Sequence, residues 1–227
     1  MNTPLTTPLP HATALDVQRN RVLRNTYGLL ALSLLPTVAG AWLGVSTGIT
    51  AGLTGWMGLV VFMAGAFGFM YAIEKNKDRA AGVPLLLAFT FFMGLMLSRL
   101  VAVVLGKANG AELVMTAFGG TAGVFVLMAF LSSVIRRSLE GMGQWLTVGA
   151  LVLMVGAVVN VFVGSPVGMA VISVLAIGIF SLFILYDLKR IVDGGETNYI
   201  SATLGLYMSL FNVFQSLLAL LGLSSDD

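Results

Sequence analysis

The sequence predicts an all-α polytopic membrane protein in which seven helices cross a bilayer, and two observations support this fold class. Hydrophobic residues make up 58% of the 227 residues and charged residues only 10%, with a mean hydropathy of +0.97. About a quarter of the residues of a soluble domain are charged. The apolar residues also form continuous runs of about 20 residues, the length of a membrane-spanning helix. A membrane β-barrel would show shorter segments of alternating polarity.

The apolar runs define the elements in order. We expect helices at residues 27–45, 50–73, 84–105, 113–135, 145–163, 167–186 and 200–223. The break between the fifth and sixth rests on Gly164-Ser165-Pro166, a turn signal that contains no charge. Pro84 suits a helix start.

The ends of the chain differ from its apolar middle. Residues 1–22 are expected to form a disordered cytoplasmic tail, because half of them are polar and three prolines interrupt them. Residues 23–223 form the seven-helix transmembrane domain, and residues 224–227 a short acidic tail. A cleaved signal peptide is the alternative for the N-terminus. Against it, the polar leader is long and the apolar run continues to Val45.

The basic residues predict the orientation. Ten of the twelve fall in the N-terminal segment or in the loops after the second, fourth and sixth helices, which share one side: Arg19, Arg21, Arg24, Lys75, Lys77, Arg79, Arg136, Arg137, Lys189 and Arg190. The other side has Lys107. Basic loops stay in the cytoplasm, so we expect a cytoplasmic N-terminus and an outside C-terminus.

The composition also excludes several function classes. There is no Cys and one His, His11, so neither a disulfide framework nor a thiolate or His-rich metal site is expected. No Ser–His or Cys–His set exists for nucleophilic catalysis. We therefore expect no catalytic residue, metal or cofactor, and no enzyme. The net charge of +2 reflects topology rather than a nucleic-acid partner; the expected surroundings are the lipid bilayer.

Polar groups inside a bilayer are costly and are therefore candidates for function. Asp187 is expected to end the sixth helix near the cytoplasmic boundary. One interpretation is an interfacial carboxylate paired with Lys189, Arg190 or another loop cation. The other is a protonatable gate.

The seventh helix carries a polar stripe. Its members are Ser209, Asn212, Gln215 and Ser216, of which residues 209, 212 and 216 share one helical face. A polar stripe should turn away from lipid, so we expect this helix in the middle of the bundle or along a cavity. Hydrogen bonding between helices explains the stripe as well as a functional site does.

Four further polar residues are candidates. Arg99 in the third helix is expected to extend outward to the membrane surface, with a partner such as an amide of the seventh helix as the alternative. Asn160 is expected to bond a neighbouring helix. Glu74 is expected to be solvated, or else to contact the loop before the seventh helix. In that loop Thr197 or Asn198 can cap the seventh helix, and Glu196 complements its positive end.

Several motifs resemble the Bax inhibitor-1 family, and within it the bacterial YccA branch. They are Tyr186-Asp187, the GGETNYI run at residues 194–200, the LYMSLFNVF run at residues 206–214, the VLRNTY run at residues 22–27, and Leu-Leu-Gly at residues 220–222. The resemblance covers essentially the whole chain.

The resemblance implies a seventh helix enclosed by the other six and location in the bacterial inner membrane. Family members are described as calcium leak pathways gated by two aspartates. Asp187 matches the first, but the second position holds Ser209. The YccA branch instead implies a substrate and modulator of the FtsH protease, with its HflK/HflC partners. Our first hypothesis is thus a non-enzymatic FtsH modulator; the alternative is a pH-sensitive calcium or cation leak channel.

Overall fold

The computed structural model describes residues 10–225, with side chains from Val17 onward, and this part of the chain is entirely helical apart from its loops. The seven helices are α1 (Pro10–Thr47), α2 (Gly55–Asn76), α3 (Gly82–Leu105), α4 (Gly110–Val134), α5 (Met142–Val163), α6 (Pro166–Val192) and α7 (Tyr199–Ser224). Each contains a window long and apolar enough to cross a membrane. The predicted fold class and helix number are confirmed.

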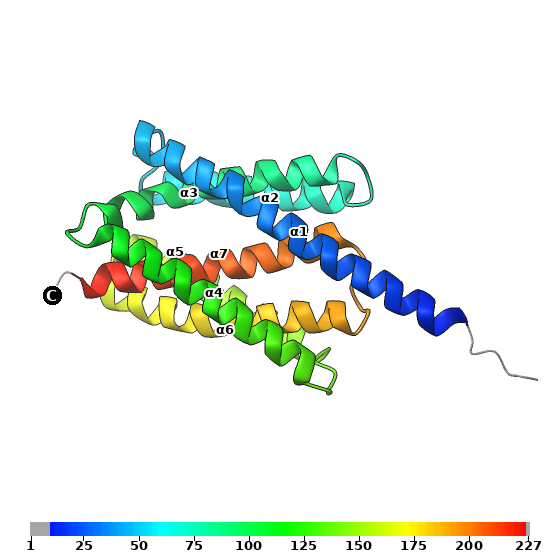
Figure 1. The fold of residues 1–227 in the computed structure, drawn as a ribbon. Helices are drawn as coiled ribbons and strands as arrows, with labels where there is room; N and C mark the ends of the chain where they lie inside the picture. Colours follow the sequence, from blue (N-terminus) through cyan, green and yellow to red (C-terminus); the bar gives the residue numbers. More distant parts are fainter. Residues whose placement is uncertain (1–9, 226–227) are drawn as a thin grey trace, which may run out of the picture.

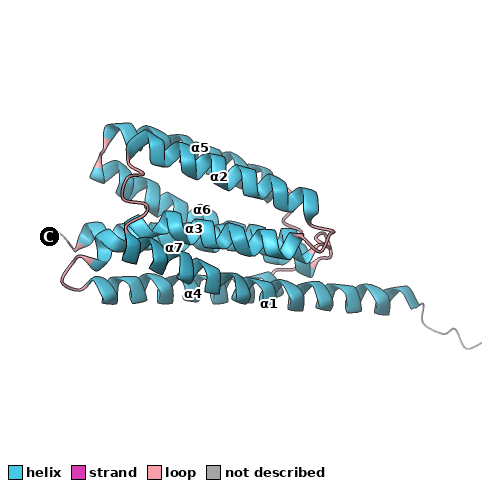
Figure 2. Cartoon of the chain, turned by 90° about the horizontal axis from the view of Figure 1, so that it is seen from above, coloured by secondary structure: helices cyan, strands magenta, loops and turns pink. Residues whose placement is uncertain are grey.

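The helices form three layers, which Figure 2 shows from above. α2 and α5 make one outer layer, α1 and α4 the other, and α3, α6 and α7 lie between them. α7 contacts every other helix except α5, which contacts only α2 and α6. Half of the most apolar window of α7 is buried, more than in any other spanning helix. α7 therefore contacts five of the other helices, and its enclosure by all six stays a prediction.

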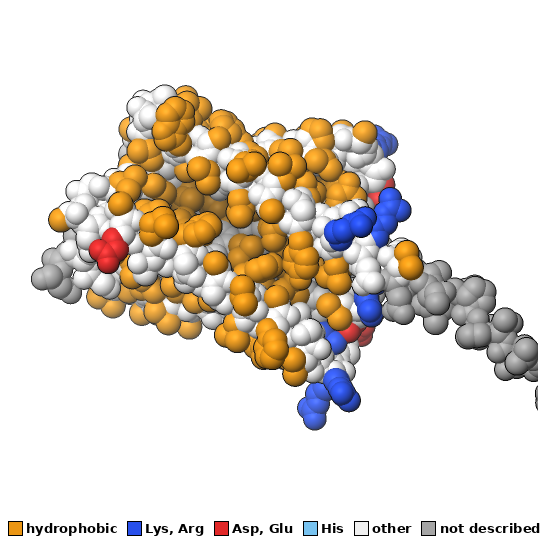
Figure 3. Space-filling model, in the orientation of Figure 1, with side chains coloured by type: hydrophobic (Ala, Val, Ile, Leu, Met, Phe, Trp, Pro, Cys, Tyr) orange, Lys and Arg blue, Asp and Glu red, His pale blue; other side chains and the backbone are white. Residues whose placement is uncertain are grey.

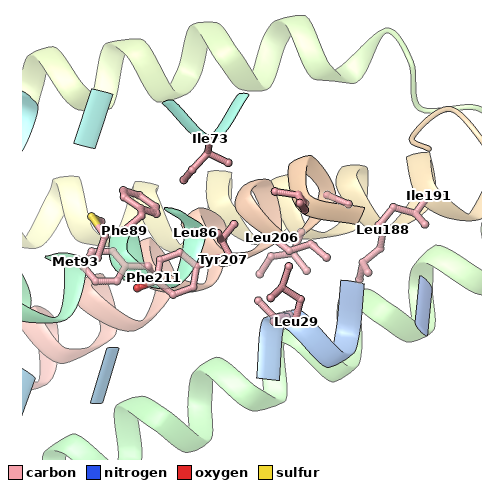
Figure 4. Close-up of a cluster of buried hydrophobic side chains, with 14 of the residues drawn as sticks. Leu29, Ile73, Leu86, Phe89, Met93, Leu188, Ile191, Leu206, Tyr207 and Phe211 are labelled. Carbon is pink, nitrogen blue, oxygen red and sulfur yellow. The ribbon is translucent and has the colours of Figure 1, made fainter. Parts of the chain in front are cut away.

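A single large cluster of apolar side chains holds the middle layer together. Tyr207 and Phe211 of α7 lie beside Phe89 and Met93 of α3, while Leu29 of α1 approaches from the other side (Figure 4). The rings of Phe89 and Tyr207 meet edge to face, with centroids 6.0 Å apart. Because lipid is as apolar as these side chains, close packing rather than escape from water favours this arrangement.

α1 and α3 make the closest helix contact in the bundle. A Cβ atom added to Gly94 would lie 2.1 Å from the carbonyl oxygen of Thr37, and one added to Gly40 would lie 2.2 Å from that of Phe91. The two glycines therefore let the backbones touch, as small residues do in membrane helices.

The break between the fifth and sixth helices is confirmed. Gly164 ends α5 in the left-handed conformation, with φ of 67°. Ser165 caps α6 by accepting a 3.0 Å hydrogen bond from the backbone N–H of Gly168, and Pro166 occupies the first turn. These are the residue preferences of a helix end followed by a helix start.

Two helices have boundaries that differ from the prediction. α2 begins at Gly55 rather than residue 50, because residues 48–54 form turns, and Gly48 and Gly55 on either side of these turns have positive φ. α6 continues past residue 186 to Val192, so Asp187 lies inside the helix rather than at its end. Lys189 and Arg190 in its last turn favour this extension, because cations stabilise a helix C-terminus.

The N-terminal segment also differs from the expected disordered tail. Residues 10–22 form the first turns of α1, where Ala, Leu, Gln and Arg favour helix and Val22 is buried in the main cluster. Residues 1–9 of the expected tail lie outside the described residues, as do residues 226 and 227 of the expected acidic tail.

The two ends of the bundle differ in charge. Because successive helices run in opposite directions, the loops after α2, α4 and α6 lie at the end where α1 begins (Figure 1). Figure 3 shows Lys and Arg side chains gathered at this end and hydrophobic side chains over the rest of the visible face. We call it the basic end; its assignment to the cytoplasm stays a prediction.

The α1–α3 contact predicts the effect of adding one methyl group. Gly94→Ala should lower the free energy of unfolding by about 1–3 kcal/mol, because a backbone carbonyl occupies the space that the new Cβ needs. Thermal unfolding of the detergent-purified protein measures this change. The control is Gly28→Ala in α1, because the added Cβ would have nothing within 4 Å. Equal melting temperatures for the two variants would contradict the close contact.

Candidate functional site

The candidate site lies at the basic end, where Asp187 of α6 faces α7. A Cβ atom built on Gly205 would lie 3.1 Å from Oδ2 of Asp187, so this glycine leaves room for the carboxylate. Ser209 lies one turn further along α7, on the same helical face as Gly205. The structure thus places Asp187 against the face of α7 that carries Ser209.

Asp187 and Ser209 do not form a bonded pair. No hydrogen bond or ion pair to the Asp187 carboxylate is found among the described residues, and none joins it to the buried hydroxyl of Ser209. The charges that act on Asp187 over longer range are the attractive Arg190 and the repulsive Glu196. The expected pairing with Lys189 does not occur, because Lys189 donates to Asp193 at 2.6 Å.

An ion pair between Arg190 and Glu196 spans the loop that joins α6 to α7, a few residues after Asp187. Nη2 of Arg190 lies 3.0 Å from Oε2 of Glu196, and the other carboxylate oxygen of Glu196 accepts from the backbone N–H of Asn198 at 3.0 Å. Gly194 turns the chain after α6 with φ of 80°. The Glu196 carboxylate therefore bonds both sides of this loop, Arg190 at the end of α6 and the backbone of Asn198 before α7.

Asn198 is the cap of α7, one of the two residues that the sequence offered. Its Oδ1 accepts from the backbone N–H groups of Ile200, at 2.9 Å, and Ser201, at 3.2 Å. Its Nδ2 donates to Oδ1 of Asp78, at 2.8 Å, in the loop after α2. One side chain thus satisfies the open amides of α7 and joins two loops that are far apart in sequence.

Glu74 adds a second link between the same segments. It forms an ion pair with Lys77, and its Oε2 accepts from the hydroxyl of Ser201 in the first turn of α7 at 3.1 Å. Hydrogen bonding to Glu74 raises the pKa of Lys77 above its usual value. Of the two expectations for Glu74, contact with the region of the last loop is the one that the structure shows. We call the group Glu74, Asp78, Asn198 and Ser201 the loop clasp.

The four residues of the polar stripe of α7 have different environments. Ser209 and Ser216 are buried, whereas the amide of Asn212 bonds its own helix by donating to the carbonyl oxygen of Met208 at 2.8 Å. Gln215 is exposed and lines a cavity at the far end of the bundle. The stripe is therefore not a single row of contacts between helices.

Arg99 and Asn160 lie away from the candidate site. Arg99 is exposed and donates from Nη1 to the carbonyl oxygen of Leu53 at 3.0 Å, in the loop between α1 and α2. The side chain of Asn160 lies against α6, since a Cβ on Gly168 would be 2.6 Å from its Oδ1. Asn160 thus contacts the neighbouring helix, but no side-chain hydrogen bond is found for it in the described part of the chain.

Sequence reasoning missed a buried group of hydroxyls beside the site. The Tyr207 hydroxyl lies 2.8 Å from Oγ1 of Thr37, and Thr203 donates to the carbonyl oxygen of Thr26 at 3.4 Å. Oγ1 of Thr26 is buried and has no hydrogen-bond partner among the described residues. Isolated Thr and Tyr residues are common in membrane helices, so their positions in the sequence gave no signal; only helix packing brings them together.

No group of three or more His, Cys, Asp or Glu that could hold a metal ion occurs among the described residues. What the site offers is a carboxylate held close to a small-residue face of the central helix, beneath a hydrogen-bonded loop. Such an arrangement can bind or release a proton or cation, or change shape when the loop clasp opens.

Comparison with known proteins shows which family the chain resembles. The family model for inhibitor of apoptosis-promoting Bax1 matches residues 19–226. An uncharacterised protein of Neisseria meningitidis is 40% identical over 219 residues, covering 95% of this chain and 96% of that protein. The modulator of FtsH protease YccA of Escherichia coli K12 is 36% identical over 208 residues, covering 92% of each chain. An uncharacterised membrane protein of Vibrio cholerae is 32% identical over the full length of both.

These matches agree with the motifs at residues 194–200 and 206–214 and with the seven spanning helices. The family model covers far more than half of the chain, and several relatives exceed 30% identity over nearly their whole length. The chain therefore belongs to the Bax inhibitor-1 family of membrane proteins and is a homologue of YccA.

Proposed function

We propose that this protein is a non-enzymatic modulator and substrate of an FtsH-type protease in the bacterial inner membrane. The observation that carries the proposal is the 36% identity to the FtsH modulator YccA over 92% of both chains. One relative is named as an inner membrane protein. The resemblance described above also favours it, because it implies a second gating aspartate at the position where this chain has Ser209.

The shape of the basic end supports engagement by a membrane protease. α1 contains 38 residues, about 57 Å of helix, whereas the hydrocarbon core is about 30 Å thick. Figure 1 shows that α1 extends past the other helices at its N-terminal end. Such a projection gives the protease a segment that it can engage without first separating the bundle.

Removing the projection should lengthen the lifetime of the protein. Deletion of residues 2–16 leaves Arg19, which bonds the last carbonyl of α6, and should raise the half-life several-fold in cells that contain the protease. Pulse–chase labelling measures it. Removal of residues 226 and 227, at the other terminus of the sequence, is the control and should have no effect. An unchanged half-life after the N-terminal deletion, or an equal increase in cells without the protease, would contradict the proposal.

A leak channel is the second candidate, and Asp187 is the observation that favours it. Its carboxylate is unpaired among the described residues and faces the central helix. Gating by two aspartates needs a second carboxylate, however, because the response to pH comes from a proton shared between coupled groups. Ser209 cannot provide one.

Ion flux separates the two candidates. Liposomes that contain the purified wild-type protein should show no calcium flux above empty liposomes between about pH 6 and 8, because one carboxylate cannot form the coupled pair. Ser209→Asp should create a pH-dependent flux, and adding Asp187→Asn to it should remove that flux. Calcium-sensitive dye inside the liposomes reports all three. A wild-type flux that Asp187→Asn abolishes would favour the channel.

A further inference from the structure

A cavity of about 370 Å³ lies at the end of the bundle opposite the basic end. Its wall comes from α2, α3, α5, α7 and the loop between α1 and α2. Most of the lining is apolar, with Phe62, Leu100, Val161 and Phe211 among the residues. Arg99 and Gln215 are the two long polar side chains in it. Its volume falls within the range of about 300–1,000 Å³ that small-molecule sites occupy.

The packing of α5 explains why the space exists and what has access to it. α5 contacts α2 and α6 but not α7, so the face of α7 that carries Gln215 is left uncovered. α2 and α5, which flank the space, have the least buried spanning windows of the seven helices. Most of the apolar surface of these two helices is therefore not covered by other helices, so in a bilayer the molecules beside this cavity are lipids.

Arg99 supplies a charge that the protein does not balance. It lies six residues before the end of α3, about 9 Å along the helix axis, so its long side chain can extend toward the headgroups of the bilayer. Only the carbonyl oxygen of Leu53 accepts from it, and no carboxylate forms an ion pair with it within the described residues. A guanidinium has five N–H donors, so several remain for an anion.

We propose that this cavity binds one phospholipid, with an acyl chain between α2 and α5 and the phosphate on Arg99. The planar guanidinium matches two oxygens of a phosphate, and the apolar wall matches the chain. Gln215 adds an amide to the same lining, and an amide N–H can donate to the ester oxygens of a phospholipid. Lipid bound here would complete the packing of α7 on the one side where no helix covers it.

Native mass spectrometry of the delipidated protein, titrated with dioleoyl phosphatidylglycerol in detergent, tests the proposal. Wild-type protein should bind a first lipid more tightly than all later ones. Arg99→Gln should weaken that first affinity about tenfold, the effect of losing charge-assisted hydrogen bonds. Lys107→Gln, which removes the other basic residue of this end outside the cavity, should leave it unchanged.

A second pair of variants tests the acyl chain independently of charge. Val161→Trp fills the cavity and should abolish the tight first site, whereas Val163→Trp, two residues along α5 and outside the lining, should keep it. Thermal unfolding confirms that each variant is folded. Equal affinities for wild type and Arg99→Gln, or for the two Trp variants, would overturn the proposal. Tight binding of oleate with no tight phospholipid site would also overturn it, because the occupant would then be a free fatty acid.

Discussion

The burial of α7 among five other helices is the arrangement on which the rest of the structure depends. Lipid offers no partner for a bare backbone amide or carbonyl, so every segment that crosses the bilayer must be a helix. Association of these helices then relies on close contact. α7 makes this close contact through Leu206, Tyr207 and Phe211, which pack against α1 and α3 in the main cluster.

The position of the candidate site follows from the same packing. Asp187 and Gly205 meet because α6 and α7 form an antiparallel pair in the middle layer. The short loop between them carries Glu196 and Asn198, whose hydrogen bonds set the start of α7. The loop clasp then ties this start to the end of α2. A change in the clasp would therefore act on the start of the central helix.

The two ends of the bundle have different chemical characters. At the basic end, several cations pair with carboxylates of the protein, as Arg190 does with Glu196. At the other end, Arg99 bonds only a carbonyl oxygen within the described residues and borders an apolar cavity.

Helix number, helix type and family were determined by the sequence alone, because long apolar runs and specific local motifs do not depend on distant contacts. The end of α5 at Gly164 and the cap at Asn198 were predictable for the same reason: each depends on residues a few positions away. The start of α1, the extension of α6 past Asp187 and the separate surroundings of Asn212 and Gln215 were decided by tertiary structure. So were the clasp between Glu74 and Ser201 and the cavity at Arg99. These features join residues that are far apart in the chain, and apolar periodicity in lipid does not specify which helix faces which.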